Sequence, residues 1–593
     1  MDGISGDRSP TPLAMSQLFS TEVLACAIAA VLCIFAAHRV KDDKPYALTV
    51  GLYVLGALLV SAAIGFYFGF RIKARELSGL KATIALGAAA LSIWEAGRIV
   101  QKKPVRQRYV KAVAFALAAM SVAAYVRFGD IGYRKFYHRW EHFHYYMGSK
   151  YHRELGYKGL YECTAIAQVD LGMRNEVKAR KLRNLDIDVL ESTEAILANP
   201  DKCKSRFTPE RWEAFKADVK FFRRASGLKY WNDMQKDHGY NPPPVWTVAG
   251  YLLSSLHPAS ERYQQILAAI DPLLFIGLFG AVFWAFGWRV FCVALTFWGC
   301  QLPAEYFWTG GAFLRQDWLF FLILCACLLK KRYFALAGAA FAYSTLLRVF
   351  PAPLLFGPIV VAGWYLWKHR RFKKEHLRVA YGGIAATALL VAVSVGITGK
   401  DSYRGFWEHI QVHNSTPLTN HMGLKTIVSH SLEGRMQYTR DEKLMDPFIN
   451  WKQMRRDRFE DLKPIYYAVV AAIAVALAFV LRRVKSLWIA LCLSVVMVAA
   501  LVELTCYYYS FFILAALLSR LRRDFEHAAL IVAGTSQLVV NIPLISYYYD
   551  DRYTVQSMLF FVYGVGLVVA FWPMARKALE ARARPTEETT AAA

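Results

Sequence analysis

Long apolar runs alternate with short polar segments along most of the chain. The first run covers residues 16–37 and the last covers 555–574. Because roughly 18 apolar residues suffice to cross a bilayer as a helix, the pattern predicts about fifteen transmembrane helices. They begin near residues 16, 46, 80, 109, 266, 290, 315, 333, 354, 378, 464, 486, 508, 527 and 554. The expected fold class is therefore an all-α polytopic membrane protein.

Two long polar segments, 129–262 and 400–463, interrupt this pattern. Apolar residues recur at helical spacing within the first, which predicts amphipathic helices at an interface or packed on the membrane domain. The two sets are Leu182, Leu185 and Val189, and Trp212, Phe215, Val219 and Phe222. The segment 245–256 is apolar but too short to span, and three prolines precede it, so we expect a re-entrant or interfacial helix there.

The spans and polar segments divide the chain into five units. They are the accessory N-terminal transmembrane helices (1–108), the first catalytic transmembrane helix with the large outer loop and its re-entrant segment (109–265), the central transmembrane helices (266–399), the second outer loop (400–463), and the C-terminal transmembrane helices with a cytoplasmic tail (464–593).

Composition and charge agree with a membrane location. Of 593 residues, 56% are hydrophobic and 15% aromatic, and the formal net charge of +26 is better explained by cytoplasmic loops than by nucleic acid. Basic clusters at 98–111, 330–332, 368–378, 482–485 and 520–523 all fall on one side if there are fifteen spans. The positive-inside rule makes that side cytoplasmic, together with the tail 576–584, and makes both long polar segments extracytoplasmic. We see no cleavable signal peptide, and expect a multi-pass protein of the plasma (inner) membrane with its site on the outer face.

Eight of the ten cysteines fall within or beside apolar spans, and no CxxC motif occurs. Only Cys163 and Cys203 lie in the first polar segment. If that segment is extracytoplasmic, its compartment permits a disulfide between them.

The first polar segment carries the strongest candidate for catalysis. Glu141 lies in Trp140-Glu141-His142-Phe143-His144-Tyr145-Tyr146, shortly after a predicted span. A carboxylate at the membrane surface can take a proton from a hydroxyl group as a general base. Asp130 is the competing candidate, and a solvated loop acid remains the alternative for Glu141.

The order of sequence features resembles a known class. A helix is followed by the outer acid, then by Gly156-Tyr157-Lys158-Gly159-Leu160-Tyr161, amphipathic helices, and Tyr240-Asn241-Pro242-Pro243. Over about residues 109–575 this resembles the GT-C class of polyprenyl-phosphate-sugar-dependent glycosyltransferases, particularly bacterial mannosyl- and arabinosyltransferase-like members. The three spans before residue 109 are additional to the usual plan of that class.

The resemblance implies an inverting sugar transfer from a polyprenyl-phosphate-linked donor to an extracytoplasmic lipid, glycan or protein acceptor. An Asp or Glu of the first outer loop is the general base in that class. The matching position is Glu141, with Tyr145 four residues later as a substrate-binding candidate beside His142.

Two arginines are candidates for binding the phosphate, because a guanidinium group matches phosphate oxygens. Arg315 follows the flexible pair Gly310-Gly311, and Arg348 lies at the outer end of a predicted span. An Arg315–Asp317 pair or interfacial snorkelling is the alternative for Arg315. Three acids lie at membrane depth and are expected to be paired or functional. Asp271 is expected to be a structural partner, whereas Glu305 and Glu503 lie close to the outer face.

The second polar segment contributes further substrate-binding candidates, whose side chains can hydrogen-bond a sugar and a phosphate: His413, Asn420, His421 and Lys425. An ordinary solvated loop is the alternative. His409 and His413 share a helical face, but no HExxH motif accompanies them, so no protein metal site is predicted and a divalent cation stays open as a cofactor.

Two other functions remain open. An O-antigen polymerase or ligase also uses a large outer loop and arginines on a lipid-linked glycan. A lipid-linked-sugar transporter or flippase belongs to a different class, and such proteins often contain repeated halves with broken helices near the midplane. We find no convincing repeat, and the polar residues gather toward one face.

Overall fold

The computed structural model describes residues 20–40, 45–131, 134–542 and 548–572. Almost all of its regular structure is helical, and the strands form two small antiparallel pairs, β1 (Lys181–Asn184) with β2 (Val189–Ser192) and β3 (His421–Met422) with β4 (Leu504–Thr505). The predicted all-α class is therefore confirmed. The start of the first predicted span, the end of the last one and the basic tail lie outside the described residues.

Eight helical segments in the described part of the chain are long and apolar enough to cross a membrane, judged by length and composition. They are α2 (Thr21–Arg39), α3 (Tyr46–Tyr67), α4 (Ala74–Val100), α5 (Gln107–Tyr125), the continuous segment Glu261–Phe286 with α16 (Glu261–Ala268) and α17 (Ile270–Phe286), α23 (Lys374–Thr398), α27 (Ile449–Leu481) and α33 (Tyr549–Phe571). These helices indicate a membrane-integral protein, whereas the count of about fifteen spans stays a prediction.

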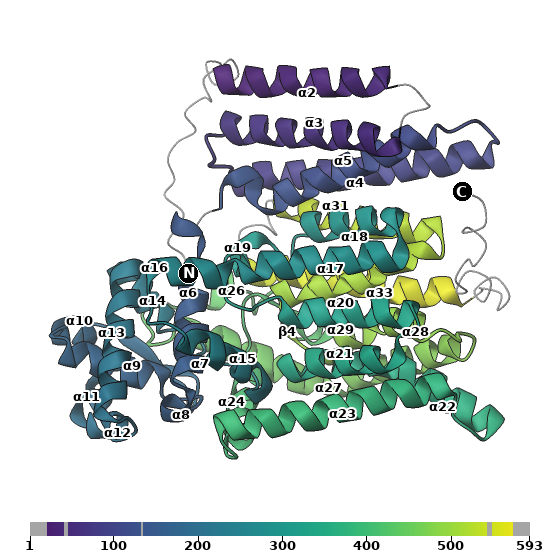
Figure 1. The fold of residues 1–593 in the computed structure, drawn as a ribbon. Helices are drawn as coiled ribbons and strands as arrows, with labels where there is room; N and C mark the ends of the chain where they lie inside the picture. The colour runs from purple at the N-terminus through teal and green to yellow at the C-terminus, as the bar shows by residue number, and fades with distance from the viewer. Residues whose placement is uncertain (1–19, 41–44, 132–133, 543–547, 573–593) are drawn as a thin grey trace.

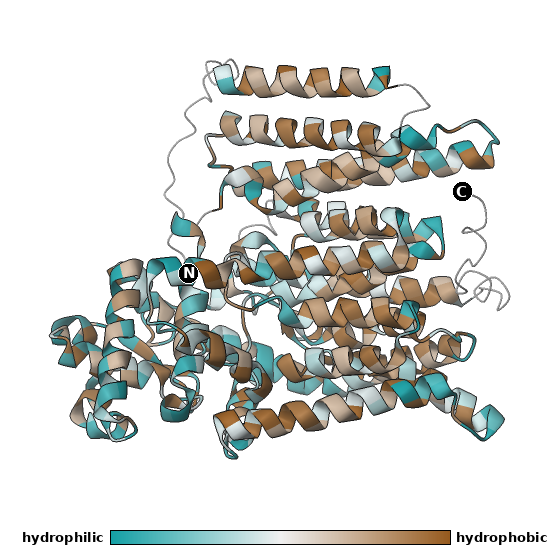
Figure 2. Cartoon of the chain, viewed as in Figure 1, coloured by the Kyte–Doolittle hydropathy of each residue, from teal (hydrophilic) through white to brown (hydrophobic). Residues whose placement is uncertain are grey.

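Shorter helices occupy most of the other predicted positions. They are α18 (Trp288–Cys300), α20 (Asp317–Lys330), α21 (Phe334–Leu347), α22 (Phe356–His369), α28 (Leu487–Leu493), α29 (Val495–Leu501), α30 (Ile513–Leu517) and α31 (Arg523–Leu538). In Figure 1 the long helices and most of these shorter ones are stacked in one bundle, and Figure 2 shows apolar residues along their length.

The N-terminal helices lie at the outer edge of the bundle, where α4 packs on α31 (Figure 1). Glu95 of α4 is fully buried and pairs with Arg289 of α18 and with Arg523 of α31, the latter at 2.7 Å. A buried charge is tolerated when it is paired in this way. This ion-pair cluster ties the accessory helices to the rest of the bundle.

The first polar segment forms a compact body of short elements at one end of the bundle (Figure 1). They are α6 (Arg139–His142), the π-helix η3 (Phe143–Met147), α7 (Gly148–Lys150), α8 (His152–Leu155), α9 (Leu160–Asp170), α10 (Arg174–Lys178), α11 (Glu194–Ala198), α12 (Asp201–Lys204), α13 (Pro209–Ser226) and α14 (Leu228–Met234). Figure 2 shows that polar residues are concentrated there.

Of the two amphipathic helices predicted in the first polar segment, one prediction is confirmed and the other is wrong. In α13 the residues Trp212, Phe215, Val219 and Phe222 are all buried, as their spacing predicts. Leu182 and Val189 lie instead on the paired strands β1 and β2. The backbone reverses at Asp188, which has a left-handed φ of 57°, and Arg183 donates to its carbonyl group at 2.8 Å. This turn converts a helix-like spacing into a hairpin.

Cys163 of α9 and Cys203 of α12 form a disulfide with a Cα–Cα distance of 5.5 Å. The sequence left this bond open, and the structure forms it. It joins two elements of the polar body, both buried at these positions.

The segment after the three prolines forms α15 (Pro244–Ser255), a helix of 12 residues. Pro244 occupies its first position, where no backbone donor is needed. Trp246 is fully buried, whereas Leu252 and Leu256 are exposed, and the helix packs on α23 and α7. The helix is too short to span a bilayer, as predicted; its insertion into the membrane stays a prediction.

Candidate active site

Glu141 lies in α6 and points to an arginine from a distant part of the chain. Its Oε2 atom is 2.8 Å from the Nε atom of Arg315. The backbone N–H of His138 donates to the Gly311 carbonyl group at 2.8 Å, which joins the start of α6 to the loop that carries Arg315. Gly311 has a φ of 66°, a backbone conformation that glycine adopts without strain.

Arg315 is the centre of the cluster and is only 4% exposed. Its backbone N–H donates to the Asp271 carboxylate at 3.1 Å, which gives Asp271 the structural role expected for it. Its guanidinium group donates to the Tyr145 hydroxyl and lies 4.6 Å from the centre of the Tyr145 ring. Since the carboxylate that pairs with Arg315 is Glu141, the alternative pair with Asp317 does not form between these described residues.

Arg348 lies at the end of α21 and faces the same tyrosine. It forms no ion pair within 4.0 Å among the described residues, but its charge acts on the buried carboxyl group of Asp317. Its guanidinium carbon is 5.8 Å from the Tyr145 ring centre and 5.8 Å from that of Trp246. The side chain is buried, and Nη1 donates to the Leu347 carbonyl group at 2.8 Å. The Nε and Nη2 atoms are buried without a hydrogen-bond partner in the described chain. Such an arginine is costly unless a ligand completes it.

Aromatic residues of the proline motif enclose the cluster. Trp246 meets Tyr145 edge-on, with ring centres 5.0 Å apart, and donates from its indole nitrogen to the Leu314 carbonyl group at 3.0 Å. Tyr240 lies against Tyr145 at 6.2 Å. The Glu141 motif, the Tyr-x-Pro-Pro motif and the arginine loop, which the sequence suggested separately, therefore meet at one place.

Burial and the neighbouring charges act in opposite directions on the pKa of Glu141. Burial raises the pKa of Glu141, while the charges of Arg315, His144 and Arg348 oppose that rise and Asp237 adds to it. Burial opposes the charge on Arg315, yet Glu141 and the neighbouring tyrosine groups hold its pKa above the usual value. The cluster thus holds a protonated guanidinium group beside a carboxyl group whose ionisation depends on it.

Asp237 was missed by the sequence reasoning. Its Oδ2 atom accepts a hydrogen bond from the indole nitrogen of Trp140 at 2.5 Å and lies 4.0 Å from His144. Its side chain is 33% exposed, more than that of Glu141 at 13%. The only sequence signal was its position three residues before Tyr240 of the motif.

His142 does not reach the cluster as expected. Its ring is fully buried, with Nδ1 2.6 Å from the Gln264 side-chain oxygen and Nε2 3.1 Å from the Gly311 carbonyl oxygen. Burial lowers its pKa to about 4, so the ring is neutral at ordinary pH. Because protein groups take both nitrogens, His142 supports the arginine loop instead of contacting a substrate.

Asp130 contacts other residues than Glu141 does. Its carboxylate accepts from Arg127 at 2.8 Å, and Arg127 also donates to the Ile72 carbonyl group at 2.8 Å. These bonds join the end of α5 to the α3–α4 connection. The structure brings Glu141, and not Asp130, to the two arginines.

The second polar segment reaches the same region through β3 and β4. Cys506 donates from its backbone to the Asn420 carbonyl group at 2.9 Å, which fixes the two tyrosines that follow it. These tyrosines, Tyr507 and Tyr508, face Arg315, with ring centres 5.0 Å and 5.8 Å from its guanidinium carbon. The second polar segment therefore reaches the cluster indirectly, through the backbone bond of Asn420 to Cys506.

His421 and Lys425 engage a buried acid beside this strand pair. Glu503 lies 2.9 Å from the Lys425 amine and 3.7 Å from His421. Burial opposes ionisation of Glu503, but His421 and Lys425 hold its pKa well below the usual range. His413 lies elsewhere, 5.4 Å from the ring of His238, which is bonded to Asp188 at 2.8 Å.

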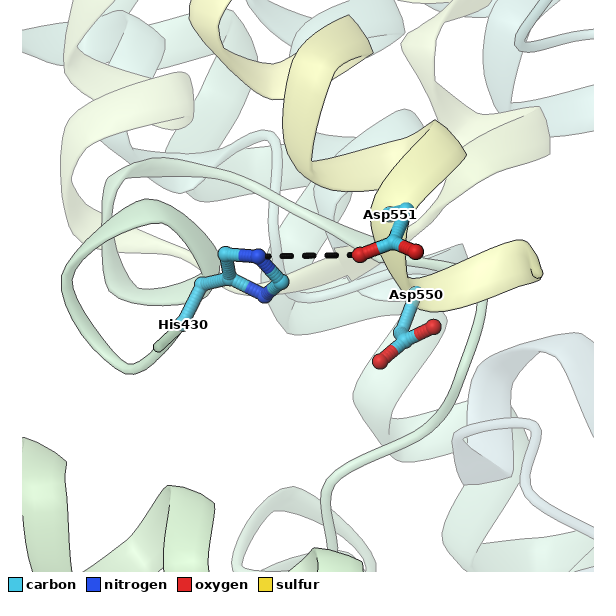
Figure 3. Close-up of side chains that lie close together, drawn as sticks. All are labelled: His430, Asp550 and Asp551. Atoms are coloured by element: carbon cyan, nitrogen blue, oxygen red, sulfur yellow. Dashed lines mark ion pairs between the residues drawn. The ribbon is translucent and has the colours of Figure 1, made fainter. Parts of the chain in front are cut away.

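A third cluster has the ligand types of a cation site. Figure 3 shows His430, Asp550 and Asp551, whose ligand atoms lie within 4.8 Å of one another. Arg435 already binds Asp551 through both carboxylate oxygens, at 2.9 Å from Nε. Asp550 accepts from Trp451 at 3.1 Å. Because an arginine neutralises one of the two carboxylates, the residues fit a structural ion pair better than a divalent cation, and we assign no cofactor role here.

Comparisons of this chain with protein-family models, curated proteins and solved structures find no match.

Proposed function

We propose that the chain is a membrane glycosyltransferase of GT-C type. It transfers a sugar, with inversion, from a polyprenyl-phosphate-linked donor to an acceptor hydroxyl group. The site lies on the extracytoplasmic face of the plasma (inner) membrane, and the acceptor is a lipid, a glycan or a protein. Glu141 acts as general base, and Arg315 and Arg348 bind the phosphate.

One observation carries the proposal. Two buried arginines converge on Tyr145, and one of them has two buried N–H groups without a partner, whereas the other holds the candidate base. A lipid phosphate supplies the acceptor oxygens that Arg348 lacks in the described chain, and phosphate groups match guanidinium geometry.

The reaction needs little beyond these groups. Glu141 takes the proton of the acceptor hydroxyl as its oxygen attacks the anomeric carbon of the sugar. The new bond forms from the face opposite the phosphate, and the bond from the anomeric carbon to the phosphate oxygen breaks. The polyprenyl phosphate leaves with that electron pair, and Arg315 and Arg348 stabilise its added negative charge.

A second candidate uses the same cluster. Two arginines also suit the diphosphate of a lipid-linked glycan, as an O-antigen polymerase or ligase requires. Polyprenyl-monophosphate sugars and polyprenyl-diphosphate glycans, supplied separately to purified protein, separate the two enzymes. A lipid-linked-sugar flippase would move either lipid across a vesicle membrane without forming a glycosidic bond.

The test compares wild type with Glu141→Gln and with a matched control, Glu154→Gln. Glu154 also forms an ion pair with an arginine of the polar body, the half-buried Arg211, at 2.6 Å, and no hydrogen bond or ion pair in the described chain joins it to Arg315 or Arg348. Transfer of radiolabelled sugar that is lost in Glu141→Gln and kept in Glu154→Gln supports the proposal. Equal transfer by all three proteins contradicts the role of Glu141.

A further inference from the structure

The Glu141–Arg315 ion pair joins two groups that the proposed reaction uses for different substrates. The carboxylate serves the acceptor hydroxyl, and the guanidinium serves the phosphate of the sugar donor. In this structure the two groups form an ion pair, with Arg315 Nε 2.8 Å from Glu141 Oε2, and both side chains are largely buried. That Oε2 atom accepts no hydrogen bond from the described chain. A carboxylate bound to a guanidinium group is a weaker base than a free one, since the positive charge stabilises its ionised form.

Arg348 differs from Arg315 in its partners. Within the described chain, its guanidinium group hydrogen-bonds to the carbonyl group of its neighbour Leu347, and two of its buried nitrogen atoms have no acceptor there. An anion that enters the cluster therefore gains most by binding Arg348 first, because no ion pair has to break there.

Tyr145 connects the two arginines. Its hydroxyl accepts from Arg315, and its ring faces both guanidinium groups, at 4.6 and 5.8 Å from the ring centre. A phosphate on Arg348 thus lies against the same aromatic side chain as Arg315, and it competes with the Glu141 carboxylate for the positive charge of the Arg315 guanidinium group.

We infer that Arg315 passes from Glu141 to the phosphate of the sugar donor when that donor binds, so that Glu141 becomes a free base only in the donor complex. This inference rests on the proposed function and adds an order of binding to it. The sugar donor binds first, and the acceptor hydroxyl is deprotonated only afterwards.

The electrostatics of the cluster follow the same direction. Burial raises the pKa of Glu141, and Arg315 is the largest of the charges that restrain it; His144 and Arg348 restrain it further, and Asp237 opposes them. When a phosphate neutralises both arginines, the restraint is removed and the carboxylate becomes a stronger base.

The test measures binding of a sugar-free polyprenyl monophosphate to purified full-length protein in detergent. If the carboxylate competes with the phosphate, Glu141→Gln binds this lipid about tenfold more tightly than wild type, a coupling within the range usual for linked sites. Arg315→Gln binds it more weakly. In the Arg315→Gln background, Glu141→Gln produces no further tightening, because the competed group is absent. Glu154→Gln binds as wild type does.

Equal or weaker binding by Glu141→Gln overturns the inference. Inorganic phosphate provides a second arm. Tightening with both ligands identifies the phosphate group as the competitor, whereas tightening confined to the lipid assigns the effect to the polyprenyl tail and also overturns the inference.

The two proposals can fail separately. If Glu141→Gln still transfers sugar, the base assignment is wrong whatever the lipid affinity. If Glu141→Gln loses transfer but its affinity for the lipid is unchanged, Glu141 remains the base, but Arg315 does not pass from Glu141 to the phosphate. As a check that needs no variant, initial rates of wild type with both substrates varied are expected to fit ordered binding with the sugar donor first; random or acceptor-first order contradicts the inference.

Discussion

The Nε atom of Arg315 lies 2.8 Å from the Oε2 atom of Glu141, and both side chains are largely buried. Arg315 comes from the loop before α20, and Glu141 from the polar body after α5. The pair therefore links the bundle to the first polar segment at the point where Arg348 has unpartnered donors.

Arg348→Gln is expected to weaken binding of a polyprenyl phosphate sugar by roughly 10- to 100-fold, the usual effect of losing hydrogen bonds to a charged group. Since the charge of Arg348 acts on the buried Asp317 carboxyl group, the melting temperature of Arg348→Gln is measured alongside, and Arg348→Gln with Asp317→Asn is the matched variant that leaves no uncompensated acid. Arg348→Lys keeps the positive charge but loses the planar guanidinium group, so its affinity for the lipid donor should lie between those of wild type and Arg348→Gln. Isothermal titration with the lipid donor measures this, and an unchanged affinity in Arg348→Gln would remove the residue from the phosphate site.

The pH profile of transfer should report the pKa of Glu141. A general base acts only when ionised, so transfer is lost as the pH falls through that pKa. Because burial raises it above the ordinary value of 4.5, the acid limb of kcat/KM should lie above pH 4.5. His138 and His142, whose pKa values burial lowers to about 3 and about 4, should contribute no limb near neutral pH.

Two substitutions should move this limb in opposite directions. Arg315 lowers the pKa of Glu141, so Arg315→Gln is expected to move the limb upward. Asp237 raises it, so Asp237→Asn should move the limb downward. Profiles of kcat/KM report the free enzyme, in which Arg315 still pairs with Glu141, and they are therefore the profiles that should show both shifts. Shifts in the same direction for both variants would mean that the titrating group is not Glu141.

The disulfide between Cys163 and Cys203 should stabilise the polar body. It closes a separation of 40 residues, for which chain entropy predicts roughly 4 kcal/mol at most. Reductant, or the double change Cys163→Ser with Cys203→Ser, should therefore lower the melting temperature. Cys26→Ser is the control, because that cysteine is free. If reductant leaves both the melting temperature and the number of reactive thiols unchanged, the bond does not form in the protein.

Glu95 should be essential for holding the accessory helices in place. Glu95→Gln removes the charge that faces Arg289 and Arg523, and breaking a buried ion pair typically costs about 3 kcal/mol or more. We expect a lower melting temperature and faster proteolysis of the connection 101–106 in detergent. Glu22→Gln, on the exposed face of α2, should change neither. Full stability of Glu95→Gln would show that apolar packing alone docks α4.

The sequence predicted those features that depend on local patterns. Apolar runs identified the positions of the helices, and the spacing of Trp212, Phe215 and Phe222 identified the buried face of α13. The number of spans could not be read from the same runs. Helices such as α18 and α20 contain only 13 and 14 residues and are mostly buried, and an apolar run alone does not distinguish a short buried helix from a spanning one.

The site was predicted as separate residues and not as an arrangement. Glu141, Arg315, Arg348 and Tyr145 were each identified by residue type and position, but no local pattern specifies that they meet. His142 was misplaced because its neighbour Glu141 points the other way around a helical turn, toward Arg315. Asp237 was missed because only the folded chain brings it to Trp140.

The most direct test of the account is sugar transfer by the purified protein. Wild type, Glu141→Gln and Glu154→Gln are each supplied with a panel of polyprenyl-phosphate sugars and a membrane lipid extract, and the formation of glycosylated product is measured. The account predicts transfer by wild type and Glu154→Gln, and a loss of at least about 100-fold in Glu141→Gln, in line with removal of a general base. Transfer by Glu141→Gln at the wild-type rate would contradict it.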